Sequence, residues 1–234
     1  SFMSDQLKSG ERSFRMKLMF VGQENVGKTS VVRAMKRAIS GGLSGGGTAP
    51  AAPPGERPPL STDGIDIETI TMQHADSIDQ SKHVLQFTVL DFAGQEIYYA
   101  THQVFLTERA IYMVVWDLRK TPKECRVDYW LHAITAAAPK SPIFLVGTHL
   151  DDKSVDPKKV LSNLEALLPQ YKKRFRIRGL EMVSCIAGEN ISAMVTNICN
   201  AALREPTMGA KFPTSHFIFE EHLQIRRNQL KEAN

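Results

Sequence analysis

Apolar and polar residues are arranged along this chain in two different patterns, one typical of strands and one typical of helices. Residues 16–21 form a mostly apolar run that ends at a glycine, and the stretch after it places Val31, Met35 and Ile39 four positions apart. A short apolar run is typical of a β-strand, whereas apolar residues every three or four positions are typical of one face of a helix. This part of the chain therefore predicts a strand followed by a helix.

Later apolar runs predict two kinds of strand. Residues 65–72 alternate strictly between apolar and polar, and residues 83–90 form a second half-exposed run, with residues 80–82 as a hairpin connection. Residues 110–116 and 143–147 contain no charged residue, which is typical of strands buried on both faces of a mostly parallel sheet.

Segments with helical spacing of apolar residues lie between and after these runs, at residues 124–138, 157–169 and 190–204. Repeated alternation of strands and helices predicts a doubly wound α/β domain.

Three other stretches stand apart from this pattern. Residues 1–13 form a polar lead-in, and residues 206–234 form a tail that begins with a helix-ending proline. Residues 41–60 are rich in glycine and proline, cannot build a core, and predict a flexible insertion.

Composition narrows the class of protein. The 234 residues are 42% hydrophobic and 23% charged, as in an ordinary globular protein, and a net charge of +4 is too small to imply a nucleic-acid partner. Three scattered cysteines, Cys125, Cys185 and Cys199, favour a reducing, cytoplasmic compartment over a disulfide scaffold. No apolar run approaches the roughly 20 residues needed to insert in a membrane. Residues 172–178 carry five basic residues, which predicts a solvated edge strand.

The sequence Gly22-Gln-Glu-Asn-Val-Gly27-Lys28-Thr29 is a complete phosphate-binding motif, G-x-x-x-x-G-K-[ST]. It follows a predicted strand and opens a predicted helix, so a chance glycine-rich turn is a poor explanation. Backbone N–H groups of such a loop surround phosphates, Lys28 reaches the outer phosphates and the Thr29 hydroxyl binds Mg²⁺. The nucleotide-binding residues predicted here are Gly22, Asn25, Val26, Gly27, Lys28, Thr29 and Ser30.

A second motif, Asp91-Phe-Ala-Gly94-Gln95, follows the strand predicted at 83–90. At the end of that strand, Asp91 can hold Mg²⁺ through a water molecule. The Gly94 N–H can meet a γ-phosphate, and Gln95 can orient an attacking water as the catalytic residue.

Two further motifs predict a guanine site. Thr148-His149-Leu150-Asp151 ends the strand that begins at residue 143. A carboxylate that accepts two N–H bonds from guanine would be left unsatisfied by adenine, so Asp151 gives strong discrimination. Ser184-Cys185-Ile186 lies between a predicted strand and a helix, where a loop would cover the base. His149 either contacts the base or packs against its own loop.

The order of these motifs resembles a Ras-type small GTPase, and the details resemble the Roc domain of the Roco family, which includes the leucine-rich repeat kinases. The Roc pattern T-H-x-D stands at 148–151, where ordinary Ras-like proteins carry Asn-Lys-x-Asp. Residues 62–65 are similar to the family's first switch, and Thr101-His102 adds support. The resemblance covers residues 14–205, and the tail from residue 206 is similar to the opening of the COR region.

This resemblance implies a Ras-like fold with a six-stranded, mostly parallel sheet and helices on both faces. It implies a slow GTPase that binds GTP or GDP with Mg²⁺, with Thr62 as a metal ligand (Ser61 is a rival) and a homodimer formed through Roc and COR. An interaction module with negligible turnover is the alternative, and an ATP-binding protein conflicts with Asp151. Glu24 and Asn25 replace the usual small glycines, and Glu24 either crowds the γ-phosphate or faces solvent.

Overall fold

A six-stranded sheet forms the centre of the protein in the computed structural model, which describes residues 11–42, 48–53, 55, 64–76, 78, 80–94 and 106–212. Four residues named above, Ser61, Thr62, Gln95 and His102, lie outside the described residues, as do Thr101 and the tail from residue 213. The predictions made for them therefore stay predictions.

The strands follow the order β3-β4-β2-β5-β6-β7 across the sheet. All neighbouring pairs are parallel except β3 and β4, which form an antiparallel hairpin. Their bounds are β2 (Arg15–Val21), β3 (Ile65–Ala75), β4 (Lys82–Phe92), β5 (Ala110–Asp117), β6 (Ile143–Thr148) and β7 (Ile177–Met182). The α/β class, the number of strands and the hairpin are thereby confirmed.

Burial differs between the middle and the edge of the sheet as the two strand patterns predicted. Every residue of β5 and β6 is buried, because helices cover both faces of these parallel strands. On the edge strand β3, exposed and covered positions largely alternate, and Ile67 is 46% exposed.

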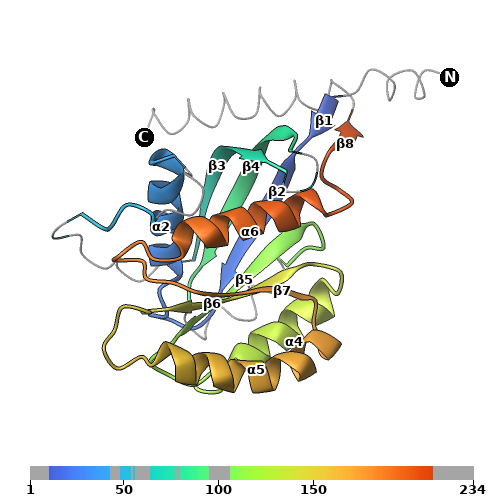
Figure 1. Ribbon diagram of the computed structural model, residues 1–234. Helices are drawn as coiled ribbons and strands as arrows, with labels where there is room; N and C mark the ends of the chain where they lie inside the picture. The colour runs from blue at the N-terminus through green and yellow to red at the C-terminus, as the bar shows by residue number, and fades with distance from the viewer. Residues whose placement is uncertain are drawn as a thin grey trace.

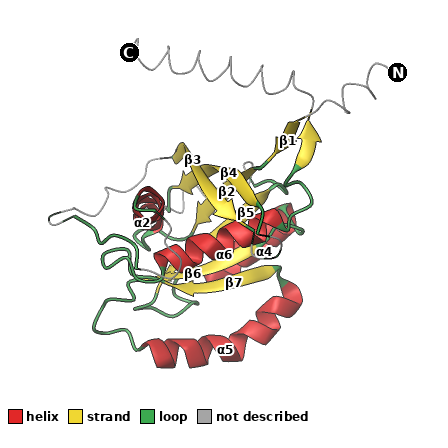
Figure 2. Ribbon diagram, turned by 45° about the horizontal axis from the view of Figure 1, so that its top comes forward, coloured by secondary structure: helices red, strands yellow, loops and turns green. Residues whose placement is uncertain are grey.

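In the described part of the chain, four helices cover the sheet: α2 (Lys28–Ser40), α4 (Val127–Ala137), α5 (Pro157–Arg174) and α6 (Ile191–Leu203). Because crossovers between parallel strands are right-handed, α4 and α5 lie on one face beside β5, β6 and β7. On the other face α2 packs against α6, which crosses the sheet (Figure 1). Figure 2 shows α5 and α6 on opposite sides of the strands. Among the described residues, no helix has the length and apolar character needed to cross a membrane.

The basic run at 172–178 does not form the single edge strand that the sequence had predicted. Its first three residues form the last turn of α5, which continues past Pro169, and strand β7 begins only at Ile177. Basic side chains at a helix C-terminus are stabilised by the helix dipole. Arg176, between the two elements, forms a 2.9 Å ion pair with Glu205.

Residues that the sequence placed outside the α/β pattern form a small second sheet. Strand β1 (Glu11–Ser13) pairs antiparallel with β8 (Ala210–Phe212), and the Gly209 N–H donates to Ser13 O at 2.8 Å. The lead-in and the start of the tail are therefore joined to each other next to the main sheet.

Candidate functional site

The loop between β2 and α2 needs backbone conformations that most residues avoid. Gly22 has φ 147°, and a Cβ there would lie 2.3 Å from Val115 O on β5. Gly27, the first residue before α2, has φ 91°, and Asn25 has φ 61°. Glycine and asparagine tolerate this left-handed region, which explains their places in the motif.

The start of α2 has the character of an anion site. No side chain caps it by a hydrogen bond, and its first turn contains no acidic residue. The N–H groups at a helix start lack intrahelical partners and carry partial positive charge, so they attract a phosphate.

The Lys28 side chain turns back onto the loop that precedes it. It is buried, and Nζ donates to Gly22 O at 3.0 Å and to Gln23 O at 2.7 Å. Burial lowers the pKa of Lys28 to about 8, against the opposing effect of the Asp91 and Glu24 carboxylates. A buried cation held only by carbonyl oxygens is suited to binding a stronger anion.

Asp91 has an unused oxygen beside this lysine. The Thr29 hydroxyl donates to Oδ2 of Asp91, whereas Oδ1 is buried and has no hydrogen-bond partner in the part of the chain that the structure describes. Burial raises the pKa of Asp91, although the hydrogen bond from Thr29 and the charge of Lys28 act in the opposite direction. An unsatisfied carboxylate oxygen next to a hydroxyl fits Mg²⁺, which prefers oxygen ligands.

Protein groups alone would not complete such a metal site. Within the described part of the chain, no group of three or more His, Cys, Asp or Glu side chains is placed to hold a metal ion. Mg²⁺ commonly uses one or two protein ligands together with substrate phosphates, so Thr29 and Asp91 suffice only beside a nucleotide.

Gly94 lies directly against the phosphate-binding loop. A Cβ on Gly94 would lie 2.2 Å from Glu24 N and 2.4 Å from the Gln23 carbonyl carbon, so only glycine permits this approach. Glu24 is exposed and its carboxylate acts on the charge of nearby Lys28, so both alternatives for Glu24 stay predictions. The structure thus places Gly94 at the loop, one residue before Gln95.

Thr148 connects the end of β6 to the phosphate-binding loop. Its buried hydroxyl lies 2.7 Å from Val26 O and 2.9 Å from Trp116 O, and it can donate to either carbonyl. A Cβ on Gly27 would also touch this threonine at 3.3 Å.

His149 and Asp151 follow in a turn after β6. His149 has φ 62° and is half-buried, and its Nε2 is buried without a hydrogen-bond partner. Burial lowers the pKa of His149, which favours a neutral ring suited both to a base contact and to packing. Asp151 is exposed, and the preceding Leu150 N–H donates to Val183 O at 3.2 Å, next to the end of β7.

The loop after β7 therefore lies beside the Asp151 turn. Ser184 is buried and accepts a hydrogen bond from the Ala187 N–H at 2.9 Å, whereas Ile186 is 63% exposed. Burial raises the pKa of the Cys185 thiol to about 12, so this cysteine stays a neutral thiol.

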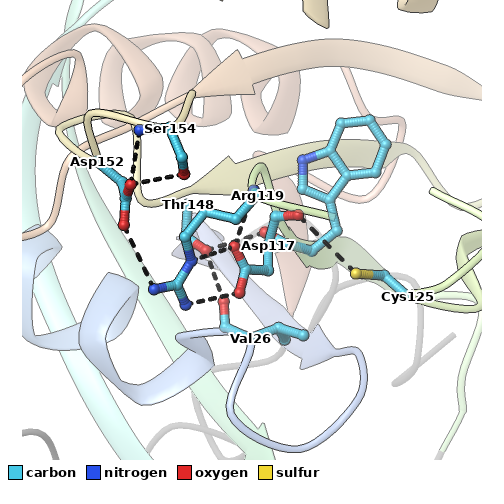
Figure 3. A network of polar contacts seen from close by, with 8 residues as sticks. Val26, Asp117, Arg119, Cys125, Thr148, Asp152 and Ser154 are labelled. Carbon is cyan, nitrogen blue, oxygen red and sulfur yellow. Dashed lines mark hydrogen bonds and ion pairs between the residues drawn. The ribbon is translucent and has the colours of Figure 1, made fainter. Parts of the chain in front are cut away.

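An ion-pair network at the end of β5 was missed in the sequence. Arg119 donates to both oxygens of buried Asp117, at 2.9 and 2.7 Å, and lies 3.5 Å from Asp152. Burial alone would raise the pKa of Asp117, but the hydrogen bonds from Arg119 hold it below its usual value. Figure 3 shows Arg119 between the two carboxylates, next to Val26 and Thr148. The sequence did contain a signal, because Asp117 directly follows the apolar run at 110–116, just as Asp91 directly follows the predicted strand at 83–90.

All these groups lie at the carboxyl ends of parallel strands, where open α/β sheets bind ligands. A G-x-x-x-x-G-K-[ST] loop, a carboxylate after β4 and a T-H-x-D turn after β6, on this sheet, define a protein with the Ras-like P-loop fold.

Comparisons with known proteins identify the family. Residues 56–151 match the family model described as "Ras of Complex, Roc, domain of DAPkinase". The chain is 35% identical over 230 residues to the probable serine/threonine-protein kinase pats1 of Dictyostelium discoideum, covering 94% of this chain and 7% of that kinase. It is 28% identical over 181 residues to leucine-rich repeat serine/threonine-protein kinase 1 of Caenorhabditis elegans, covering 73% of this chain and 6% of the kinase. The chain belongs to the Roco family and contains a Roc domain.

A solved structure shares the fold. Methanosarcina barkeri Roco2 RocCORdC bound to GDP matches with a TM-score of 0.65 and 24% identity, over 92% of this chain and 57% of that one. The present chain spans less than a tenth of the length of the curated kinases it matches, pats1 and its Dictyostelium relative roco5.

Proposed function

We propose that this chain is a guanine-nucleotide switch that binds GTP and GDP with Mg²⁺ and slowly hydrolyses GTP, within a larger Roco signalling protein. The observation that carries the proposal is the group of Lys28, Thr29 and Asp91 at one end of the sheet. Among the described residues, the buried Lys28 ammonium has no carboxylate hydrogen bond and one buried Asp91 oxygen has no partner, so both need a ligand, which Mg²⁺ with phosphate would supply.

The phosphate half of the site is assigned to the loop and the start of α2. Backbone N–H groups from Gly22 to Ser30 surround the phosphates and Lys28 neutralises the outer ones. Thr29, Asp91 through water and, with a triphosphate, Thr62 would hold Mg²⁺, which would supply charge compensation to the phosphates.

The base half is assigned to the two turns after β6 and β7. Asp151 is exposed and so is available to accept hydrogen bonds from guanine, which adenine cannot donate in the same pattern. Thr148 and His149 lie in the same turn, and the loop formed by Ser184, Cys185 and Ile186 lies beside it.

Hydrolysis is assigned to Gly94 and Gln95. The Gly94 N–H binds the γ-phosphate, while the Gln95 amide accepts from a water and donates to a transferring oxygen. Unassisted turnover in this class is slow, about 10⁻⁴ to 10⁻² s⁻¹, when no arginine finger is fixed in place.

The close approach of Gly94 to the loop favours a second candidate. Gly94 lies against the backbone of Gln23 and Glu24 so closely that a Cβ would clash with it. If this segment keeps the same position when a triphosphate is bound, the chain would act as a nucleotide-dependent interaction module with negligible turnover. In either case we place the Roc domain at residues 14–205, with the COR region following. We propose homodimerisation through both regions, in a reducing, cytoplasmic compartment that suits three free cysteines.

Nucleotide content and turnover test the proposal. The purified chain should retain GDP or GTP, and single-turnover hydrolysis should require Mg²⁺. Gln95→Leu should leave GTP affinity nearly unchanged and slow hydrolysis about 10-fold or more. Absence of turnover in wild type would select the interaction module, whereas retention of adenine nucleotides would refute guanine recognition.

A further inference from the structure

Part of the glycine- and proline-rich insertion is bound to the loop after β7. The Ala49 N–H donates to Gly188 O at 3.1 Å and the Ala52 N–H donates to Ile186 O at 2.8 Å. Ala49 is buried, with 4% of its surface exposed. Residues 48–53 therefore make defined contacts with the loop, which a linker free of the core would lack.

Gly188 shows how close the two backbones are. It has φ 74°, and a Cβ on it would lie 2.1 Å from Ala49 O and 3.2 Å from Pro50 O. No side chain fits between the two segments, so their contact depends on glycine at this position.

Arg37 joins the same two segments to α2. From the last turn of the helix, Nη2 donates to Cys185 O at 2.6 Å and Nε donates to Pro50 O at 3.4 Å. Because α2 begins at Lys28, one rigid helix connects the phosphate-binding loop to the insertion and to the loop after β7.

We propose that residues 48–53 form a strap that holds loop 184–188 in place, with Arg37 as a positioning residue, and that this strap slows nucleotide release. The inference rests on the proposed function, in which loop 184–186 covers the base. A loop must open before a base beneath it can leave. Hydrogen bonds to the strap and to Arg37 exist only in the closed loop, so they lower the fraction of time that it is open.

Two glycines provide a matched experiment. Gly188→Ala places a methyl group against the strap, whereas Gly42→Ala adds the same group at the same φ of 74°, where no atom of the described residues lies within 4 Å. Any cost of the left-handed backbone is shared, so the difference between the variants reports the strap contact. In the full 234-residue chain, Gly188→Ala should release a fluorescent GDP analogue about 10-fold faster than wild type. Gly42→Ala should stay within about 2-fold.

Arg37→Gln tests the same strap without a new backbone strain. It should also accelerate GDP release, by about 5-fold, whereas Arg33→Gln removes an exposed arginine from the same helix and should not. Hydrogen exchange at the Ala49 and Ala52 N–H groups should be faster in Gly188→Ala and Arg37→Gln than in either control.

The outcomes separate the strap from the proposed function. Faster exchange at residues 48–53 together with faster GDP release supports the strap. Faster exchange with unchanged release refutes its role in release, and full exchange of these amides in wild type refutes the strap itself. A wild-type chain that binds no guanine nucleotide refutes the proposed function, and the role in release with it.

Discussion

The phosphate side and the base side of the candidate site are organised in opposite ways. Around Lys28 and Asp91, charged groups are buried, and one Asp91 oxygen has no hydrogen-bond partner among the described residues. On the base side, buried Asp117 already has both oxygens bonded to Arg119. The first region needs a ligand to compensate its charges, whereas the buried carboxylate of the second is already paired, and the unsatisfied atom there, His149 Nε2, belongs to a ring that burial keeps neutral.

This difference indicates which part of the site should respond most to the nucleotide. Buried charges without full compensation destabilise the unliganded protein, so binding of phosphate and Mg²⁺ recovers that cost. On the base side, Asp117 and Arg119 are already paired. We call this pair a fixed frame, because it holds the turn that selects the base. Affinity should therefore depend mostly on the phosphate side and discrimination mostly on the base side.

Asp151→Asn should have the largest effect, on discrimination alone. An amide donates where the carboxylate accepts, so it fits xanthine, whose carbonyl replaces the guanine amino group. The preference for GTP over XTP should fall by about 1,000-fold and reverse. Competition titrations with GTP, XTP and ATP check this, with Asp152→Asn as a neighbouring control. Unchanged discrimination would remove Asp151 from the base site.

Lys28→Ala should weaken nucleotide binding about 100-fold for every base, because the cation facing the outer phosphates is lost. Lys36→Ala is the control, since this lysine lies on the same helix in an exposed pair with Glu68 and contributes little. Calorimetric titration with GDP and XDP measures both. A loss confined to one base would contradict the division between affinity and discrimination.

The sequence was sufficient for features that are coded locally. The uncharged runs at 110–116 and 143–147 correspond to β5 and β6, and the motif at 22–29 lies in the predicted strand-to-helix turn. These patterns depend on neighbours a few residues away, so each segment carries its own signal. Positions of the site residues follow from the ends of those strands.

Features built from distant segments were not predictable in the same way. The contact of Ala49 with Gly188 joins residues far apart in the chain, and its glycine has no special local context. The pairing of β1 with β8 likewise joins two three-residue strands from opposite ends of the described chain. Asp117 and its partner Arg119 are close in the sequence, but the burial of Asp117 that makes their pairing significant comes from the fold.

The third prediction uses pH to separate the two sides. Burial lowers the pKa of Lys28 from 10.5 to about 8, and bound phosphates should restore its charge. Between pH 7 and pH 8.5 the free lysine loses its proton, so affinity for GDP should fall about 4-fold and binding should take up a proton. Calorimetry in buffers of different ionisation enthalpy measures that uptake. The unliganded fold should gain stability as pH rises from about 8, since the unfolded chain holds this proton more tightly. Constant affinity without proton uptake would place Lys28 away from the phosphates.

The smallest effect is expected from Arg119→Gln, which tests whether the base side is a fixed frame. Loss of this side chain leaves Asp117 buried without its ionic partner and frees Asp152. GDP affinity should fall only about 3-fold, because the frame positions the Asp151 turn without touching the phosphates. The Mg²⁺ dependence of binding should stay as in wild type, which Lys28→Ala would not preserve. The double variant Asp117→Asn/Arg119→Gln should recover part of the loss, since no unpaired charge remains buried. If Arg119→Gln instead altered the Mg²⁺ dependence, the two sides would be coupled and the frame would extend to the phosphate-binding loop through Thr148 and Val26.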